Sequence, residues 1–460
     1  MLRGVPRNES SGWSRHASNP PKLLITKDQF ELNSTGSGLN NSVEESEATC
    51  GTKRALTMEE VFLTGRRMDR VPYAGIRKAF EKANELAARG VRVIHFEIGR
   101  PDFDTPLNIK EAAKSALDQG IVHYAPNAGV PALREALADS VKEHKGVDYK
   151  ADKEIIVTAG GQEALYLTFM SILDPSDEVL IPNPAFGTFP SAVHLAGGIP
   201  VAIDLVPSDN FMFDLEAAAK VITPRTKAMI VNSPHNPTGS VLTREQLETI
   251  AVFAAQHNLI LVSDEAYDRM VYDGHVHHSP ASLPGMRERT IICGSLSKTY
   301  AMTGWRIGYI AAPEPVVDAA TRVQQNVMLS LCAFAQMGAI AGLTQSQSFT
   351  EEMMQEFTRR RKLMLEMLKQ VAGLELESVP KGTFYLFPKI TLPGISSAQL
   401  ADHLLESAGI AVIDGAVFGS NGNGHLRISY ASSYDNCKEG MERLAVAMSK
   451  LAAGTKAVAR

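Results

Sequence analysis

The sequence contains few tryptophans and few cysteines. Only 2 Trp and 4 Cys residues occur among 460. The cysteines are far apart and form no CxxC pair, so their spacing predicts neither a disulfide framework nor a metal site. This usage fits a reducing compartment, and we therefore expect a cytoplasmic protein. The four positions are Cys50, Cys293, Cys332 and Cys437.

An excess of positive charge is also missing. The 46 Lys and Arg residues are outnumbered by 51 Asp and Glu residues, which gives a net charge of −5. No basic run resembles a nucleic-acid-binding arm, so we expect no nucleic-acid partner. With 44% hydrophobic and 21% charged residues, the chain is expected to fold into two packed units that bind a small molecule.

Long apolar runs are absent as well. The longest stretch without a charged residue, residues 323–350, is interrupted by glutamines and an asparagine. A membrane span needs about 20 predominantly apolar residues. The stretch therefore predicts a buried or interfacial helix, and we expect no membrane association.

Residues 1–56 differ in composition from the rest of the chain. They are rich in Ser, Asn and Gly and show no sustained helix or strand period, so we expect a disordered N-terminal extension. Basic residues near the start are typical of an organelle transit peptide, but amphipathicity is missing. A solvated tail, or a natural start at Met58, accounts for the composition better. The charged residues concerned are Arg3, Arg7, Arg15, Lys22 and Glu9.

Residues 155–313 alternate short β-rich runs with helical patterns. Seven such runs predict a mostly parallel seven-stranded sheet covered by helices, an α/β fold. Ligands of such sheets bind beyond the carboxyl ends of the strands. The residues at these ends are Gly160, Asn232, Asp264 and Ser295.

After Pro313 the pattern changes to long helices followed by short strands. It predicts a second, smaller α+β unit. The expected helices are 316–345, 349–371 and 436–452, and the expected strands are 374–388, 410–413 and 425–430.

Hydroxyl and basic side chains gather in the stretch that follows the run TIICG. Ser295, Ser297 and Arg306 suit a phosphate, which needs several donors and a forked cation. Between them, Lys298 could form an imine with a carbonyl, as in pyridoxal phosphate sites. Taken alone, Lys298 would more often be a solvated surface lysine.

Asp264 ends an apolar run, where a carboxylate could keep the nitrogen of a pyridine ring protonated. The alternative is that Asp264 caps a helix. Tyr267 follows three residues later, and its phenol could approach the hydroxyl of the same ring. Asn236 lies in a loop rich in Pro and Gly and could donate to that oxygen.

Two further features allow both a structural and a functional interpretation. Gly160, Gly161 and Gln162 join a strand to a helix start, where free N–H groups favour an anion. Arg427 alternates with apolar residues and so projects from the opposite face of its strand. Most such arginines face water, whereas a site arginine would grip a substrate carboxylate.

Taken together, these segments resemble the class I pyridoxal-phosphate aminotransferases of fold type I, in the branch of prokaryotic-type aspartate aminotransferases. The likeness runs from about residue 68 to residue 452. Several motifs in the order of the family carry it: IGRPDFDTP at 98–106, YAPNAGVPALREAL at 124–137, NSPHNPTG at 232–239, SDEAY at 263–267, SLSKTYAMTGWRIGY at 295–309 and HLRISYA at 425–431.

The resemblance implies pyridoxal 5′-phosphate as cofactor and assigns roles to matched residues. Lys298 would bind the cofactor covalently and move the proton, and Asp264 would pair with the pyridine nitrogen. Arg427 would bind the substrate carboxylate, helped by the Gly99 backbone, Asn236 and Phe186. The remaining cofactor contacts would be Tyr267, Asn236, Phe186, Gly160, Gly161, Gln162, Ser295, Ser297 and Arg306, with Tyr124 reaching the phosphate from a partner subunit.

The resemblance also implies a homodimer in which the charge-poor helix near 323–345 lies close to the dyad. The implied domains are an N-terminal arm with part of the small domain (57–105), a large cofactor-binding domain (106–325) and a small C-terminal domain (326–460).

Three positions depart from the family pattern. Gln162 stands where aspartate-using relatives have a lysine that binds the distal carboxylate, so that charge is missing. Phe186 stands where many relatives have a tryptophan, which keeps ring stacking but loses the indole donor. Arg100 replaces the commoner glutamate and has no assigned role.

The leading interpretation is a ping-pong transaminase that moves an α-amino group from an L-amino acid to a 2-oxo acid. A β-eliminating lyase with the same cofactor is the first alternative, and it would keep turning over with an amino donor alone. A non-catalytic ligand sensor is the second alternative. Such regulators carry a DNA-binding unit, and residues 1–56 show no pattern of one.

Overall fold

The computed structural model describes residues 64–73 and 75–458. The predicted disordered extension, residues 1–56, lies outside the described residues, as does Met58. Within the described part, none of the helices combines the length and apolar character that a membrane crossing requires.

The largest sheet of the described residues has eight strands in the order β2-β9-β8-β7-β6-β3-β4-β5. All seven predicted strands are present in this sheet. The predicted number of strands was nevertheless wrong, because the two-residue strand β5 is an eighth member. So short a strand has no alternation that a sequence pattern could show. The strands are β2 (Ile155–Thr158), β3 (Glu178–Asn183), β4 (Ile199–Val206), β5 (Met212–Phe213), β6 (Thr226–Asn232), β7 (Ile260–Asp264), β8 (Thr290–Ser295) and β9 (Gly308–Ala311).

The five strands from β8 to β4 pair in parallel, and β9 runs antiparallel to both β2 and β8. Both faces of this sheet are buried: Val179 and Ile181 belong to one apolar core and Leu180 to another. This explains why its strands are continuous apolar runs.

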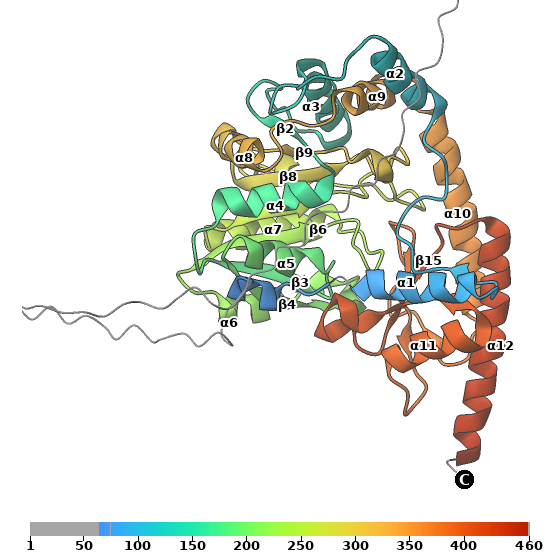
Figure 1. Ribbon diagram of the computed structural model, residues 1–460. Coiled ribbons are helices and arrows are strands. Elements are labelled where there is room, and N and C mark those ends of the chain that lie inside the picture. The colour runs from blue at the N-terminus through green and yellow to red at the C-terminus, as the bar shows by residue number, and fades with distance from the viewer. Residues whose placement is uncertain (1–63, 74, 459–460) are drawn as a thin grey trace, which may run out of the picture. The chain divides into compact units, whose positions relative to one another are not determined.

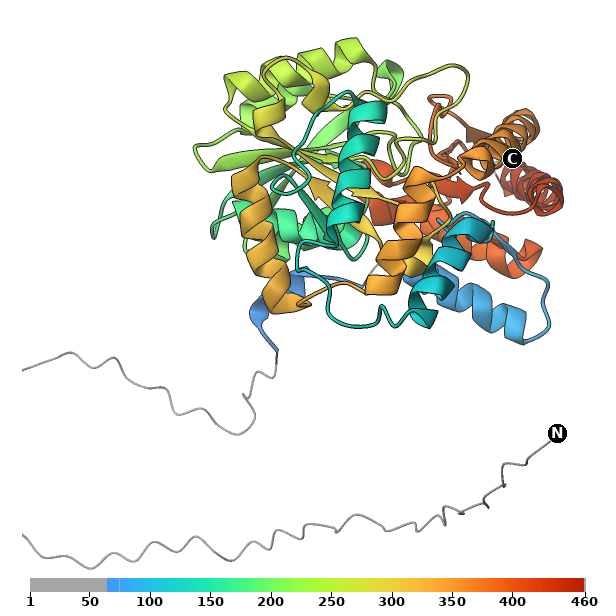
Figure 2. The ribbon, with the colours of Figure 1, turned by 90° about the horizontal axis from the view of Figure 1, so that it is seen from above.

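Helices cover both faces of the main sheet (Figures 1 and 2). One face packs against α4 (Gly161–Ile172), α5 (Thr188–Leu195) and α8 (Glu314–Val327). The other face packs against α2 (Leu107–Asp118), α3 (Pro131–Lys145), α6 (Leu215–Val221), α7 (Arg244–Gln256) and α9 (Ala333–Thr344).

The single helix expected over 316–345 was wrong, because the chain forms α8 and α9 with a break between them. At the break Leu329 has a left-handed φ of 64°. The N–H groups of Met328 and Leu329 both donate to the carbonyl of Gln324, which ends the first helix. Figure 1 shows α9 beside α2 and α3, so packing against these helices sets its direction.

Two of the glutamines that interrupt the apolar stretch, Gln324 and Gln336, are buried and bond backbone groups. Gln324 donates to the carbonyl of Val157 at 2.8 Å, and Gln336 accepts from the N–H of Val130 at 2.8 Å. Their amides therefore fix α8 and α9 to β2 and to the start of α3.

A second apolar core holds the C-terminal helices and the short strands. The long strand expected over 374–388 was wrong: β10 and β11 are separate there, and Thr383 between them has a φ of 62°. The helices are α10 (Ser348–Leu368), α11 (Ser397–Ala408) and α12 (Tyr434–Val458), and α1 (Gly75–Ala88) packs on α11 and β13 in a separate small cluster. The strands are β1 (Ile94–His95), β10 (Leu374–Glu375), β11 (Tyr385–Leu386), β12 (Lys389–Ile390), β13 (Ile410–Ala411), β14 (Ile413–Asp414) and β15 (Leu426–Ser429).

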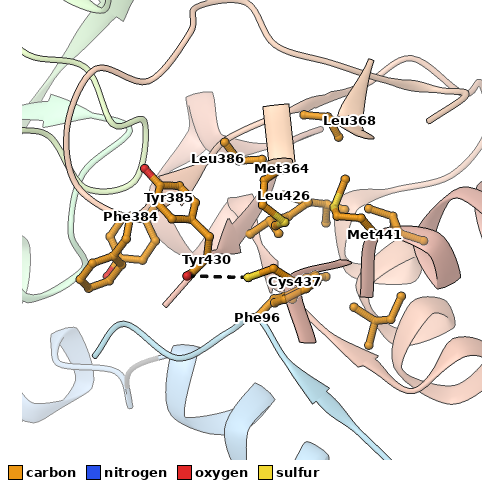
Figure 3. Close-up of a cluster of buried hydrophobic side chains, with 14 of the residues drawn as sticks. Phe96, Met364, Leu368, Phe384, Tyr385, Leu386, Leu426, Tyr430, Cys437 and Met441 are labelled. Carbon is orange, nitrogen blue, oxygen red and sulfur yellow. Dashed lines mark hydrogen bonds between the residues drawn. The ribbon is translucent and has the colours of Figure 1, made fainter. Parts of the chain in front are cut away.

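Segments from both ends of the described chain build this second core. β1 pairs in parallel with β13, and β15 lies between β11 and β14. Figure 3 shows Phe96, Cys437 and Met441 packed together, with Tyr385 at one side of the cluster. The domain limits 57–105, 106–325 and 326–460 stay a prediction.

Candidate functional site

The predicted site residues at strand ends meet at one edge of the main sheet. β6 and β7 pair in parallel up to their last residues, so Asn232 lies beside Asp264. The amide of Asn232 donates to the carbonyl of Asp264 at 3.0 Å. At the other side of the edge, Gly308 of β9 lies opposite both Thr158 and Ser295.

Lys298 lies inside this edge and not on the surface. Its side-chain amine donates to the carbonyl of Gly99 at 2.5 Å. The amine is 5.7 Å from the ring centre of Tyr267 and 6.0 Å from that of Phe384. The solvated-lysine alternative is therefore wrong for the folded chain.

The surroundings of Lys298 make its amine easier to deprotonate than that of an ordinary lysine. Burial, followed by the positive charges of Arg427 and Arg306, lowers the pKa of Lys298 to about 8, although the Asp264 carboxylate acts in the opposite direction. A neutral amine is the form that can attack a carbonyl or accept a proton.

Asp264 is 8% exposed and is the last residue of β7. Burial raises the pKa of its carboxyl group to about 6. One carboxylate oxygen accepts from the N–H of Ala266 at 3.1 Å, within a turn. No helix begins there, so the helix-cap alternative is wrong.

Arg427 is 1% exposed, because both faces of β15 are buried. The water-facing interpretation is therefore wrong. Its guanidinium donates to the side-chain oxygen of Asn236 at 3.1 Å and to the carbonyl of Glu97 at 2.8 Å. Its Nε is buried and has no hydrogen-bond partner among the described residues. The hydrogen-bonding capacity of the Arg427 guanidinium is therefore only partly used by the described residues.

Arg306 and the start of α4 form the basic corner of the site. Gly160 precedes α4 with a φ of 77°, and no side chain caps the helix. A Cβ at position 160 would lie 2.4 Å from the guanidinium of Arg306. That guanidinium donates only to the carbonyls of Ala159 and Thr303 among the described residues, at 3.0 and 2.9 Å. Its charge is therefore available to an anion.

The serine pair completes this corner. Ser297 is buried, and its N–H donates to the hydroxyl oxygen of Ser295 at 3.2 Å. A Cβ on Gly161 would lie 3.4 Å from the Cβ of Ser295. The structure therefore brings these residues and the start of α4 together, as the sequence predicted.

The structure does not bring four other residues into direct contact with Lys298. Gln162 and Arg100 are exposed, and Phe186 is half-buried with its ring edge-on to Phe189 at 5.9 Å. Tyr124 is 85% exposed. The predicted roles of Gln162, Phe186 and Tyr124 stay predictions, and that of Tyr124 requires a partner subunit.

Tyr385 is a site residue that sequence reasoning missed. Its hydroxyl lies 2.8 Å from the hydroxyl of Tyr267, and the guanidinium of Arg427 lies 4.3 Å from its ring centre. A Cβ on Gly99 would lie 2.3 Å from the Tyr385 hydroxyl. In the run FYLF an aromatic residue is typical of an apolar core, so no local signal distinguished it.

A buried ionic cluster behind Asp264 was also missed. The Glu265 side chain is 0% exposed and lies 2.8 Å from the amine of Lys145, which also contacts Asp268. Across the described residues, no group of three or more His, Cys, Asp or Glu side chains is arranged to hold a metal ion.

Comparisons with known proteins agree with this geometry. The family model described as "Aminotransferase class I and II" matches residues 91–444. The chain is 43% identical to an aspartate aminotransferase of Pyrococcus abyssi and 42% identical to aromatic-amino-acid aminotransferase 2 of Thermococcus litoralis. In both cases 82% of this chain and 96% of the relative are covered.

A solved structure shows the same fold. The aspartate aminotransferase of Thermus thermophilus with maleate superposes with a TM-score of 0.80 at 39% identity, covering 84% of this chain and 100% of that one. This confirms the expected α/β architecture of fold type I.

Proposed function

The chain belongs to the class I and II aminotransferases, and we propose that its site uses pyridoxal 5′-phosphate to carry the α-amino group of an L-amino acid to a 2-oxo acid. Family membership makes the chain a transaminase. The cofactor contacts and the substrate preference are the proposal. The observation that carries it is the Lys298 amine, which lies among Asp264, Tyr267 and Arg427 with a pKa lowered to about 8.

The residues present fit this cofactor. The uncapped start of α4, Ser295 and Arg306 offer donors and a positive charge to a phosphate. When bound, pyridoxal phosphate supplies an aldehyde that takes up the amino group and a ring that withdraws electrons. Phe186 would cover one face of that ring.

Asp264 would hold the protonated ring nitrogen. Burial raises the pKa of Asp264 to about 6 in the cofactor-free chain, and a cation beside a carboxylate lowers such a pKa again. Asn236 and Tyr267 would donate to the ring oxygen. These residues come from two separate segments, 232–239 and 263–267, which together would fix the orientation of the ring relative to Lys298.

Lys298 would hold the cofactor and then move the proton. An ordinary lysine is almost wholly protonated at pH 7, whereas a pKa of about 8 leaves roughly one-tenth of the amines neutral. A base whose pKa lies near the working pH transfers protons efficiently.

Arg427 would orient the substrate through its α-carboxylate, because a forked cation binds a carboxylate by two bonds. For the side chain, Gln162 offers a neutral amide where a charge would be needed to favour aspartate strongly. We therefore propose that neutral and aromatic donors are accepted beside Phe186, while aspartate is favoured only weakly. The two relatives, whose names mention aspartate and aromatic amino acids, fit such a range.

We also propose a homodimer in which the partner subunit's Tyr124 reaches the phosphate. In one chain this phenol is 85% exposed, and Val122, two residues before it, and Leu107, at the start of α2, are 54% and 67% exposed. Burial of these side chains against a second copy would remove apolar surface from water. Measurement of the mass in solution tests this assembly.

The proposed function is tested by offering single amino acids and 2-oxo acids to the purified holoenzyme. We expect one half-reaction with an amino donor alone and full turnover only when a 2-oxo acid is added. Continued release of ammonia and a 2-oxo acid from the donor alone would contradict transamination and favour the lyase.

A further inference from the structure

We propose that Tyr385 of β11 is a positioning residue that joins the substrate side of the site to its cofactor side. In this proposal its ring supports the guanidinium of Arg427, and its hydroxyl orients the hydroxyl of Tyr267. The inference rests on the proposed function and adds to it a residue that the motifs do not mark.

The contacts of Tyr385 reach both halves of the site. Its hydroxyl is 2.8 Å from that of Tyr267, which follows β7 of the main sheet. Its ring lies under the guanidinium of Arg427 at 4.3 Å. In Figure 3 the hydroxyl of Tyr385 points away from Met364 and the cluster around it.

Either phenol could donate in the hydrogen bond between Tyr267 and Tyr385, and the proposed cofactor selects one direction. Burial raises the pKa of Tyr267 well above its ordinary value and raises that of Tyr385. Both phenols are therefore neutral, and each has one proton to donate. If Tyr267 gives its proton to the oxygen of the cofactor ring, its hydroxyl must accept from Tyr385.

This direction has a consequence for the bound cofactor. A hydroxyl that accepts one hydrogen bond becomes a better donor in the next, because such bonds polarise one another. The ring oxygen would then be stabilised as an anion. Without the Tyr385 hydroxyl, Tyr267 loses the partner that orients its hydroxyl. The O–H of Tyr267 can then rotate away from the oxygen of the cofactor ring.

The ring of Tyr385 acts on the substrate side. The guanidinium of Arg427 is held by Asn236 and by the carbonyl of Glu97 along its edge. The ring of Tyr385 lies against the guanidinium of Arg427. In this arrangement a cation is attracted to the aromatic ring. Loss of the ring would let the cation shift before a substrate carboxylate arrives.

Two substitutions separate these roles. Tyr385→Phe removes the hydroxyl and keeps the ring, whereas Tyr385→Leu removes both. Tyr430→Phe is the matched control, since Tyr430 is a buried tyrosine of the same core whose hydroxyl donates to the carbonyl of Thr383 at 3.2 Å. Each holoenzyme is titrated with pH while the absorbance of the bound cofactor is followed, and KM and kcat for an amino donor are measured.

For Tyr385→Phe we expect the absorbance transition to move upward by about half a pH unit, as the loss of one neutral hydrogen bond predicts. KM should stay within about two-fold while kcat falls, because the ring still supports Arg427. For Tyr385→Leu, KM should rise roughly ten-fold, the change given by a loss of about 1.4 kcal/mol. Tyr430→Phe should titrate like the unmodified enzyme.

An unchanged absorbance transition in Tyr385→Phe would overturn the role of the hydroxyl. If the absorbance transition of Tyr430→Phe shifts equally, any buried tyrosine of this core would have the same effect. That result would also overturn the role of the Tyr385 hydroxyl. If the Leu variant does not fold, Tyr385→Met takes its place, and a KM unchanged in the folded variant contradicts the role of the ring. If the unmodified chain binds no pyridoxal phosphate, the proposed function itself fails, and that outcome is distinct from these.

Discussion

Removal of the Lys145 ammonium is predicted to destabilise the folded chain strongly. Lys145 lies at the end of α3 with a 2% exposed side chain, 2.8 Å from the 0% exposed carboxylate of Glu265 and in contact with Asp268. The carboxylate of Glu265 has three further hydrogen-bond partners. These are Ser279 at 2.6 Å, Ser263 at 2.8 Å and His277 at 3.0 Å.

The size of the effect follows from burial. Lys145→Met leaves two carboxylates without their cation, and the removal of one partner of a buried pair costs about 3–5 kcal/mol. The matched control is Lys142→Met on the same helix. Lys142 pairs with Asp148 at 3.1 Å, with side chains 63% and 76% exposed, and an exposed pair contributes about 0–1 kcal/mol.

The pH dependence gives a second measurement. Burial alone would raise the pKa of Glu265, but Lys145 and His277 outweigh burial and lower it below 4.5. Burial alone would lower the pKa of Lys145, but Asp268 and Glu265 raise it well above 10.5. The contribution of Glu265 is therefore lost as the pH falls below 4.5, and that of Lys145 as the pH rises above 10.5.

The assay is urea unfolding of the cofactor-free chains, followed by circular dichroism. At pH 7 the free energy of unfolding should fall by about 3–5 kcal/mol for Lys145→Met. Near pH 3 the difference in unfolding free energy between this variant and the unmodified chain should be smaller. The double variant Lys145→Met with Glu265→Gln should recover part of the loss, because one of the two carboxylates that lost their cation is then neutral. A loss below about 1 kcal/mol for Lys145→Met, similar to an exposed pair, would refute the reasoning.

Three further predictions concern the site and the N-terminal segment. Pyridoxal phosphate should bind the cofactor-free chain faster as the pH rises through about 8, where Lys298 loses its proton, and Lys298→Ala should abolish the link that borohydride traps. Persistence of a reducible link in that variant would contradict the assignment. Gln162→Lys should raise the relative kcat/KM for aspartate roughly ten-fold if about 1.4 kcal/mol is recovered, with cofactor occupancy measured alongside. An unmodified enzyme that already prefers aspartate strongly would show that Gln162 does not set the preference. A chain that starts at Met58 should bind cofactor and turn over normally, and loss of either would mean that residues 1–56 contribute to the fold.

The main sheet was predictable because its strands are short apolar runs buried on both faces. Such runs are set by local composition and bounded by turn residues. The edge that holds Asp264 and Ser295 followed directly, since the carboxyl ends of parallel strands meet there. The break at Leu329 was not predictable, because residues 328–332 contain neither Pro nor Gly and packing of α9 on α2 decides the direction of the chain.

The pairings inside the site were not predictable for a different reason. Tyr267 and Tyr385 are 118 positions apart in the chain, and Arg427 lies 191 positions from Asn236. A buried guanidinium or phenol is unfavourable alone and becomes favourable only when its partner arrives from another segment. The sequence therefore indicates which chemical groups are present, whereas the partners depend on the assembled fold.

The turn after β7 explains why the two sides of the site should respond together. Asp264 ends a strand of the main sheet, and three residues later Tyr267 packs in the second core with Tyr385. The Tyr385 ring in turn lies against Arg427, which is held by Asn236 in the loop after β6 of the main sheet. Contacts therefore lead from the main sheet through Tyr267, Tyr385 and Arg427 back to the main sheet. Loss of the whole Tyr385 side chain should for this reason alter both substrate affinity and the cofactor absorbance, whereas a change at Gln162, which no hydrogen bond or ion pair of the described residues joins to Arg427, should leave the binding of the α-carboxylate unchanged.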